Sequence, residues 1–264
     1  MMMLGIAVAA VLIFIISLVF SMFGKGGGEL YLPVLLTVMS IAFYAAAGVS
    51  LFLIFFQSIS MIFVYSHKHR LVDWKVAIVL ALVVGASSFL GGFISEGIPA
   101  LYLKITFSLF LIISALLLFL NKSIKVELGR FGIWHRKFSG GEYNLHIVYL
   151  VVPVALAGFL AGMIGISGGG LIVPIAVLLG GMPIRIAMGT NTFLVLASSS
   201  MGFAGHAVNG GIDWMLCTVL GISILAGSQI GSHMHAKVNE QSLRLGLAAI
   251  LIFAASWMIL RMMM

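Results

Sequence analysis

The residues best suited to chemistry lie in a glycine-rich stretch near the start of the chain, GKGGGELYLP at 24–33. Three consecutive glycines, 26–28, stand between two charged residues, Lys25 and Glu29. Glycine interrupts a helix, and a helix that starts after the interruption presents unpaired N–H groups and the positive end of its dipole. Such an end binds anions without the help of a charged side chain. The stretch therefore predicts an anion site, to which Lys25 adds positive charge.

Glu29 admits several interpretations. Ionisable residues inside a membrane are rare and are functional candidates by default, so Glu29 is a candidate to carry a coupled proton. It lies four residues after Lys25, which also allows a structural ion pair. A third interpretation is that the carboxylate binds amides of the glycine stretch. The three interpretations stay open at this point.

The composition indicates which class of protein holds these residues. Of the 264 residues, 62% are hydrophobic and only 8% are charged, whereas a soluble domain carries about 25% charged residues. The apolar runs are continuous and long, which favours membrane helices over barrel strands. The net charge of +7 is explained by basic loops facing the cytoplasm, so we predict no nucleic-acid partner. No nucleophile with its base and no nucleotide-binding motif is present, so we expect neither an enzyme nor a cofactor.

Ten apolar segments divide the chain. Eight are long enough to cross a membrane, and they cover about 4–23, 48–66, 75–94, 98–120, 146–163, 187–207, 213–234 and 242–261. Two are too short to cross, about 30–41 and 171–180, and each follows a glycine-rich stretch. We predict an all-α integral membrane protein in which these two half-helices form hairpins with the helices before them.

An internal repeat relates the two short segments. A shift of 141 residues places GKGGGELYLP on GISGGGLIVP at 165–174, and a shift of 140 continues the match further along the chain. The matched pairs include Gly24 with Gly165, Gly27 with Gly168, Pro33 with Pro174, Ser50 with Asn191 and Asp73 with Asp213. This series predicts two homologous membrane repeats, 1–120 and 146–264, joined by a cytoplasmic linker, 121–145. Lys25 and Glu29 have no charged counterparts, since Ile166 and Gly170 stand at the matching positions.

The basic residues favour an inverted relation between the repeats. If 67–75 and 121–145 lie in the cytoplasm and the halves are inverted, most of the 14 Lys and Arg residues are cytoplasmic. Parallel repeats also satisfy this rule, but they leave more basic residues on the outer side. We therefore predict inverted repeats, and we expect Asp73 and Asp213 to cap the helices that follow them.

Polar residues after the two hairpins complete the candidate site. Ser50, Thr190 and Asn191 are candidates to donate hydrogen bonds to a substrate oxyanion, or alternatively to cap the helices in which they lie. Gln57 and its counterpart Ser198 are candidates to line the same cavity, or to bond neighbouring helices. The predicted substrate-binding residues are Lys25, Gly26, Gly27, Gly28, Ser50, Gln57, Ser167, Gly168, Gly169, Gly170, Thr190 and Asn191. Glu29 is the predicted coupling residue, and no metal site is predicted.

The second glycine stretch carries a resemblance to a known family. GISGGGLIVP is followed by the pattern P-x-x-x-A-x-G-T-N that begins at Pro183 and ends at Asn191. Together with the repeat, these motifs resemble the sulfite exporter TauE/SafE family of membrane permeases over nearly the whole chain. The resemblance implies secondary transport of small sulfur-containing or organic anions, such as sulfite, sulfoacetate or other organosulfonates. It also implies a multi-pass protein of the bacterial cytoplasmic (inner) membrane.

We expect an alternating-access transporter that binds its anion between the two glycine-rich breaks. The expected partners are a small anionic substrate and the lipid bilayer, and we also consider proton coupling and a homodimer. One alternative is a cation or metal permease that uses Glu29 as a ligand. A second alternative is a membrane scaffold that transports nothing.

Overall fold

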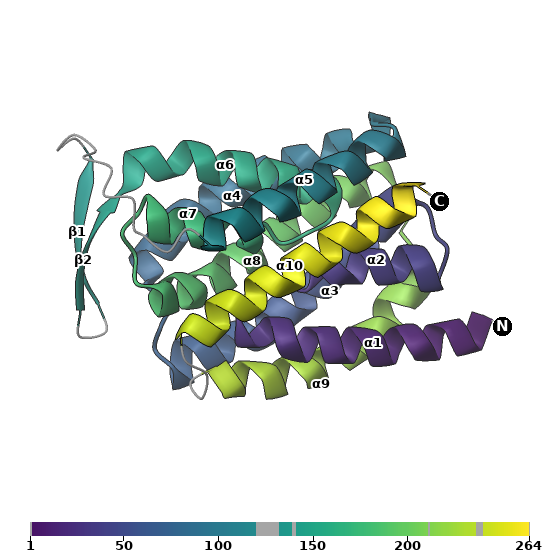
Figure 1. Cartoon of the computed structure of the whole chain (residues 1–264), viewed down its shortest axis with the longest axis horizontal. Helices are drawn as coiled ribbons and strands as arrows, with labels where there is room; N and C mark the ends of the chain where they lie inside the picture. Colours follow the sequence, from purple (N-terminus) through teal and green to yellow (C-terminus); the bar gives the residue numbers. More distant parts are fainter. Residues whose placement is uncertain (1, 120–131, 139–140, 211, 236–239, 264) are drawn as a thin grey trace.

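The protein is a bundle of helices with one small hairpin at its end (Figure 1). The computed structural model describes residues 2–119, 132–138, 141–210, 212–235 and 240–263. Within them the helices are α1 (Met2–Met22), α2 (Gly28–Val38), α3 (Phe43–Phe63), α4 (Trp74–Ile94), α5 (Ala100–Phe119), α6 (Ile147–Ile164), α7 (Gly169–Leu178), α8 (Ile184–Asn209), α9 (Trp214–Met234) and α10 (Glu240–Met263). A π-helical turn, Val64–Lys68, extends α3, and a 3-10 turn, Ser95–Gly97, follows α4. The prediction of eight long helices and two half-helices is confirmed.

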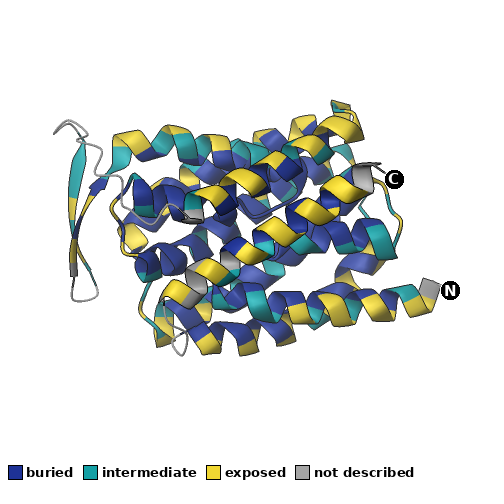
Figure 2. Cartoon of the chain, in the orientation of Figure 1, coloured by how far each residue is buried: buried dark blue, intermediate teal, exposed yellow. Residues whose placement is uncertain are grey.

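The long helices have the properties of membrane spans. In the described part of the chain, α1, α3, α4, α5, α6 and α9 are long and apolar enough to cross a bilayer. A helix satisfies its own backbone hydrogen bonds, which hydrocarbon does not supply. Large apolar side chains such as Leu82, Leu116 and Ile222 are 72%, 59% and 74% exposed. Exposed residues lie along the outward faces of the helices (Figure 2). A soluble protein does not expose so much continuous apolar surface, so this is a multi-pass membrane protein.

The two halves of the chain contact each other in corresponding pairs. Helices α3 and α8 pack together, and so do α5 and α10. Helix α1 packs on α9, while α6, its counterpart in the second half, packs on α4, the counterpart of α9. In Figure 1, α1 runs toward the end that carries the hairpin and α6 runs away from it. The halves therefore lie in opposite directions, as inverted repeats require; their common origin stays a prediction.

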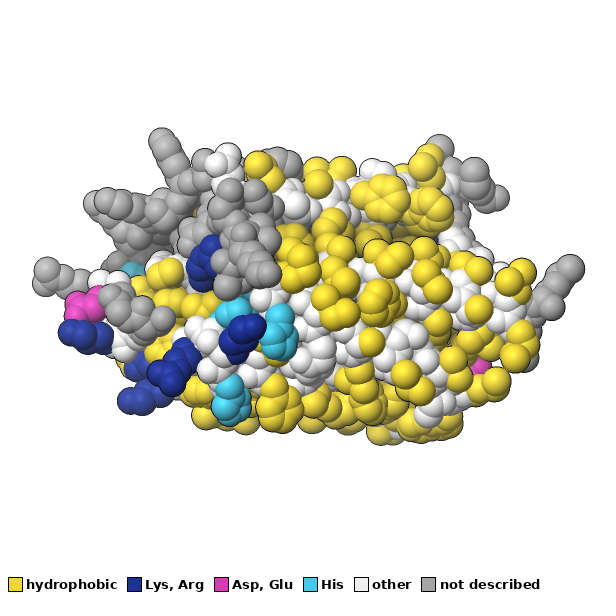
Figure 3. Space-filling model, turned by 90° about the horizontal axis from the view of Figure 1, so that it is seen from below, with side chains coloured by type: hydrophobic (Ala, Val, Ile, Leu, Met, Phe, Trp, Pro, Cys, Tyr) yellow, Lys and Arg dark blue, Asp and Glu magenta, His cyan; other side chains and the backbone are white. Residues whose placement is uncertain are grey.

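Basic residues gather at the hairpin end of the bundle. The connection between α3 and α4 carries Arg70, with Lys68 and Lys75 on either side of it, and the hairpin carries Arg136 and Lys137. On the face drawn in Figure 3, the Lys and Arg side chains lie at this same end, and apolar side chains cover most of the rest. From this distribution the positive-inside rule predicts that the hairpin end faces the cytoplasm.

The hairpin was not predicted. Strands β1 (Ile133–Phe138) and β2 (Gly141–His146) pair antiparallel, with Ile133 opposite His146. They occupy the part of the predicted polar linker that the structure describes, while 121–131 and 139–140 lie outside it. The described residues are therefore helical apart from turns, connections and this two-stranded sheet at one end of the bundle.

Asp73 ties the hairpin to the bundle. Its carboxylate accepts hydrogen bonds from Arg136 through both oxygens, at 3.0 and 2.7 Å, and from the Tyr143 hydroxyl at 2.8 Å. The same carboxylate accepts from the Val76 N–H at 3.5 Å, which confirms that Asp73 caps α4. Asp213 likewise caps α9.

We predict that Arg136→Gln loosens the hairpin and that Lys137→Gln does not. The Arg136–Asp73 pair is largely buried, and losing its charged hydrogen bonds should weaken docking by about 2 kcal/mol. The Lys137–Glu142 pair is 84% and 73% exposed, and exposed pairs contribute little. Hydrogen exchange of residues 132–138 should rise in the first variant alone. Equal protection in both variants would contradict a docking role for Asp73.

The docking should also depend on pH. Burial on its own raises the pKa of Asp73, but the hydrogen bonds from Arg136 and Tyr143 and the Arg136 charge outweigh it and bring the pKa below the usual 3.8. Because the folded-state pKa is lowered, the stabilisation is present above pH 3.8 and is lost as the pH falls through the folded-state pKa. Exchange of the hairpin amides should therefore stay slow at neutral pH and accelerate only in more acidic solution.

Candidate functional site

The two glycine-rich breaks meet in the middle of the bundle. We call residues 23–27, between α1 and α2, the first break, and residues 165–168, between α6 and α7, the second break. A Cβ atom placed on Gly28 would lie 2.9 Å from the Ile166 Cα atom and 3.1 Å from the Gly165 carbonyl oxygen. A side chain would therefore force the second break away from the first turn of α2. The contact brings the N-terminal ends of two half-helices close together.

Helices α3 and α8 each donate a side-chain hydrogen bond to the break of the opposite half. The Ser50 hydroxyl, on α3, donates to the Gly165 carbonyl at 2.7 Å, and the Asn191 amide, on α8, donates to the Gly24 carbonyl at 3.0 Å. The shift of 141 residues relates both the two donors and the two acceptors. The alternative that Ser50 and Asn191 are N-caps is wrong, because α3 and α8 begin earlier, after Ala42 and Pro183.

Gln57 and Ser198 form hydrogen bonds with the break of their own half. The Gln57 carbonyl oxygen accepts from the Gly27 N–H at 3.0 Å and from the Tyr31 hydroxyl at 2.9 Å. The Ser198 hydroxyl donates to the Ser167 carbonyl at 3.0 Å. In this conformation both side chains therefore bond to the protein, as the interhelical interpretation expects.

Thr190 forms its hydrogen bond with Asp73 and not with either break. Its hydroxyl accepts a hydrogen bond from the Asp73 N–H at 3.1 Å. Since Asp73 also bonds the hairpin through Arg136, Thr190 joins α8 to the hairpin end of α4. Thr190 is thus a neighbour of the hairpin anchor, whereas Asn191, the next residue, reaches the first break.

A second pair of equivalent bonds lies beyond the breaks and was missed by the sequence reasoning. The Tyr65 hydroxyl donates to the Ser21 carbonyl at 2.9 Å, and the His206 ring Nε2 lies 3.0 Å from the Gly162 carbonyl. The shift of 141 relates Tyr65 to His206 and Ser21 to Gly162. Applying that shift to the polar aromatic residues would have revealed this pair. Each bond ties the far end of α3 or α8 to the helix that leads into a break.

Lys25 and Glu29 form a fully buried ion pair at the meeting point. The Lys25 Nζ atom lies 2.6 Å from the Glu29 Oε1 atom, and both side chains are 0% exposed. Apart from this pair, neither the ammonium nor the carboxylate has a hydrogen-bond partner among the described residues. A Cβ atom on Gly170 would lie 3.2 Å from Lys25 Nζ and 3.3 Å from Glu29 Oε1. The pair therefore lies directly against the first turn of α7, with no side chain between them.

Further unpartnered polar atoms lie around the second break. The Ser167 hydroxyl and the Asn191 Oδ1 atom are buried without a hydrogen-bond partner in the described structure. The Asn191 amide nitrogen lies 2.6 Å from the place that a Cβ atom of Gly169 would take. Buried polar groups are normally bonded, so such a group in a native protein calls for an explanation. A polar ligand that enters here would find unused donors and acceptors from several helices.

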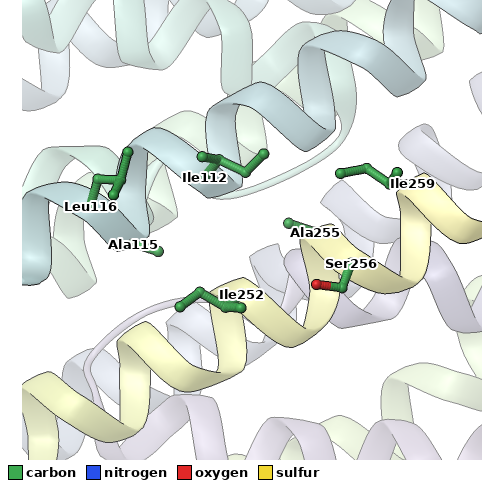
Figure 4. Close-up of a pocket in the computed structure, with 7 residues that line it drawn as sticks. All are labelled: Ile112, Ala115, Leu116, Ile252, Ala255, Ser256 and Ile259. Carbon is green, nitrogen blue, oxygen red and sulfur yellow. The ribbon is translucent and has the colours of Figure 1, made fainter.

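A separate pocket has a different chemistry. It measures about 210 Å³, lies between α5 and α10, and is lined by Ile112, Ala115, Leu116, Ile252, Ala255, Ser256 and Ile259. Figure 4 shows apolar side chains of the two helices facing this space, with the Ser256 hydroxyl as the polar group. Leu116 and Ile252 are also exposed on the outer surface. The pocket suits hydrocarbon rather than an anion, so the polar site remains the one at the breaks.

Comparison with known proteins identifies the family. The model of the sulfite exporter TauE/SafE family matches residues 9–258. This chain belongs to the TauE/SafE family. The resemblance read from the glycine motifs is thereby confirmed.

Members of the family with curated names are similar to the chain over most of its length. The probable membrane transporter protein YunE of Bacillus subtilis (strain 168) is 28% identical over 262 residues, covering 94% of this chain and 95% of YunE. The probable membrane transporter protein MJ0441 of Methanocaldococcus jannaschii is 28% identical over 253 residues, covering 90% of this chain and 89% of that protein. No solved structure matches the chain. The relatives are named as transporters rather than as enzymes, and this TauE/SafE protein is a membrane transporter by family.

We predict that Gly28→Ala destabilises this TauE/SafE protein and that Gly221→Ala does not. The new methyl group at 28 would press on backbone atoms of the second break, which should cost about 2 kcal/mol, or about 5 °C in melting temperature. At Gly221, in α9, a Cβ atom meets nothing within 4 Å, so this helix should tolerate alanine. Thermal unfolding in detergent measures both variants. Equal melting temperatures would contradict the close contact between the breaks.

Proposed function

We propose that this protein is a secondary transporter of small sulfur-containing or organic anions, such as sulfite, sulfoacetate or other organosulfonates. It moves them by alternating access across the cytoplasmic membrane of a bacterium. The observation that carries the proposal is the fully buried Lys25, which lies beside the first turn of α7 at the meeting point of the breaks. Membership of the TauE/SafE family supports transport as the activity.

The electrostatics at the breaks favour an anion. The first turns of α2 and α7 present N–H groups without helical acceptors, and both dipoles point their positive ends toward the contact. Lys25 adds a full positive charge in the same place. Discontinuous helices whose N-termini meet near the midplane are the usual way in which transporters bind anionic groups.

The bonds around the breaks support the alternating step. Substrate oxygens compete with Gln57 for the Gly27 N–H, and they meet the unpartnered Ser167 hydroxyl. The Tyr65 and His206 bonds lie on helices that run in opposite directions, so each closes the bundle toward a different surface. If the Tyr65 bond breaks while the His206 bond stays formed, or the reverse, the site opens to one membrane surface at a time. Glu29 carries the coupled proton in this scheme, and a homodimer stays a prediction.

We predict that purified protein in liposomes takes up labelled sulfite or an organosulfonate and that Gly170→Ala slows this uptake at least tenfold. The added methyl group fills the space between the first turn of α7 and the Lys25 ammonium. Gly221→Ala is the matched control, because it adds the same group where nothing is near, and it should transport as the unchanged protein does.

A broad panel of ions decides among the alternatives. Absence of both binding and flux for every anion would contradict the proposal. Metal uptake that Glu29→Gln abolishes would instead favour a cation permease. Absence of flux for anions and metals alike would favour a membrane scaffold.

A further inference from the structure

We infer that Glu29 occupies the place of the substrate in the empty transporter and that the transported species is a singly charged oxyanion accompanied by one proton. The inference rests on the proposed anion site and adds the charge of the substrate and the coupling stoichiometry. In the transport cycle, the anion replaces the Glu29 carboxylate on Lys25, and Glu29 takes up the proton as it is displaced.

The geometry of the ion pair supports this exchange. The Glu29 carboxylate already has the surroundings that an oxyanion requires, since it lies on the Lys25 ammonium at 2.6 Å and against the first turn of α7 at Gly170. One carboxylate oxygen bonds Lys25, and the other has no partner among the described residues. A structural ion pair in a dry interior is normally stabilised by additional hydrogen bonds, and the described part of the chain supplies none to this pair. The carboxylate is therefore held by Lys25 alone, which makes it replaceable.

Charge conservation sets the stoichiometry. The empty site holds one positive and one negative charge, so its sum is zero. An anion that enters without a proton leaves one uncompensated negative charge away from water, which is strongly unfavourable. If Glu29 binds one proton as the anion arrives, the sum is again zero. The proton comes from the side on which the anion enters and leaves with it on the other side.

Few other groups can take this proton. The remaining titratable side chain that faces the pair is the phenol of Tyr31, whose hydroxyl is occupied as a donor to Gln57. The elements around the pair contribute the Phe20 ring from α1, 5.4 Å from Lys25 Nζ, and the Ser114 hydroxyl from α5. Neither of these groups titrates, and the same is true of Gln57 and Asn191. Among the described residues near the site, Glu29 is the group that can compensate the incoming charge.

The substrate class follows from the same requirement that the charges in the site sum to zero. A monoanion, such as methanesulfonate or bisulfite, restores neutrality with one proton. A dianion, such as sulfite in alkaline solution or sulfoacetate, leaves one negative charge in excess, so it should be carried more slowly than a monoanion unless it binds a second proton. The site thus selects by net charge as well as by the shape of the oxyanion head group.

The test uses the full protein in liposomes that contain a pH-sensitive dye, with methanesulfonate as the probe. We expect one proton to enter with each anion, and we expect a membrane potential set by potassium and valinomycin to leave the rate unchanged. At acidic pH, where Lys25 keeps its proton, Glu29→Gln should bind methanesulfonate with an affinity that does not change with pH, because no carboxylate competes. In this range its anion flux should carry no protons and should respond to the potential. At alkaline pH the variant should bind more weakly, because a buried Lys25 without its counter-ion loses its proton.

A second measurement separates folding from binding. Glu29→Gln leaves Lys25 buried without a counter-ion, so its melting temperature without anions should fall and methanesulfonate should raise it more than in the unchanged protein. The double variant Lys25→Met and Glu29→Gln removes both charges. It should recover stability without anions and show no shift when methanesulfonate is added.

Two results overturn the inference in different ways. If the unchanged protein binds methanesulfonate but Glu29→Gln keeps the proton flux at acidic pH, then Glu29 does not occupy the place of the substrate, while the proposed anion site stands. If the unchanged protein binds no anion at all, the proposed function fails and the inference fails with it. Better transport of dianions than of methanesulfonate also overturns the charge rule.

Discussion

The rest of the structure depends on one constraint, which is that backbone groups inside a bilayer must find hydrogen-bond partners within the protein. The two breaks free carbonyl and N–H groups at the depth where water is absent. Side chains of α3 and α8 bind these groups, through Ser50 at the second break and Asn191 at the first. Because each helix serves the opposite half, α3 and α8 have to pack against each other. The breaks and the helix arrangement are thus mutually required.

The two halves make corresponding contacts, but the Lys25–Glu29 ion pair belongs to the first half and has no charged counterpart in the second. Glu29 corresponds to Gly170 in the second half, and the space that a second side chain would need is the space into which Lys25 and Glu29 project. Two carboxylates facing each other here would repel in a dry interior. A glycine on one side therefore allows a charged pair on the other. The close packing at the meeting point of the two breaks leaves room for one ion pair. This explains why the first half carries Lys25 and Glu29 while the second half carries Gly170 at the position that matches Glu29.

Much of this fold can be predicted from the sequence, because membrane helices are marked by local composition. All ten apolar segments are helices, and the glycine stretches mark where the half-helices begin. The hairpin was missed, since its strands are short and polar and it is anchored by Asp73, far away in the chain. The polar residues that contact the breaks were identifiable, but their hydrogen-bond partners were not. Ser50 bonds a carbonyl 115 residues further on, and its helix starts at Phe43, earlier than the start of the predicted segment at about 48.

The same geometry bears on the proposed alternating access of the site to two surfaces. Tyr65 and His206 make equivalent bonds, to Ser21 and Gly162, on helices that run in opposite directions. Each acceptor lies in the last turn or two of the helix that leads into a break, so moving that helix also moves the break behind it. In this structure both bonds are formed, and the Lys25–Glu29 pair is closed from both sides. Since Tyr65 and His206 differ in chemistry, their two bonds need not be equally strong, and the two open forms of the proposed cycle need not be equally populated.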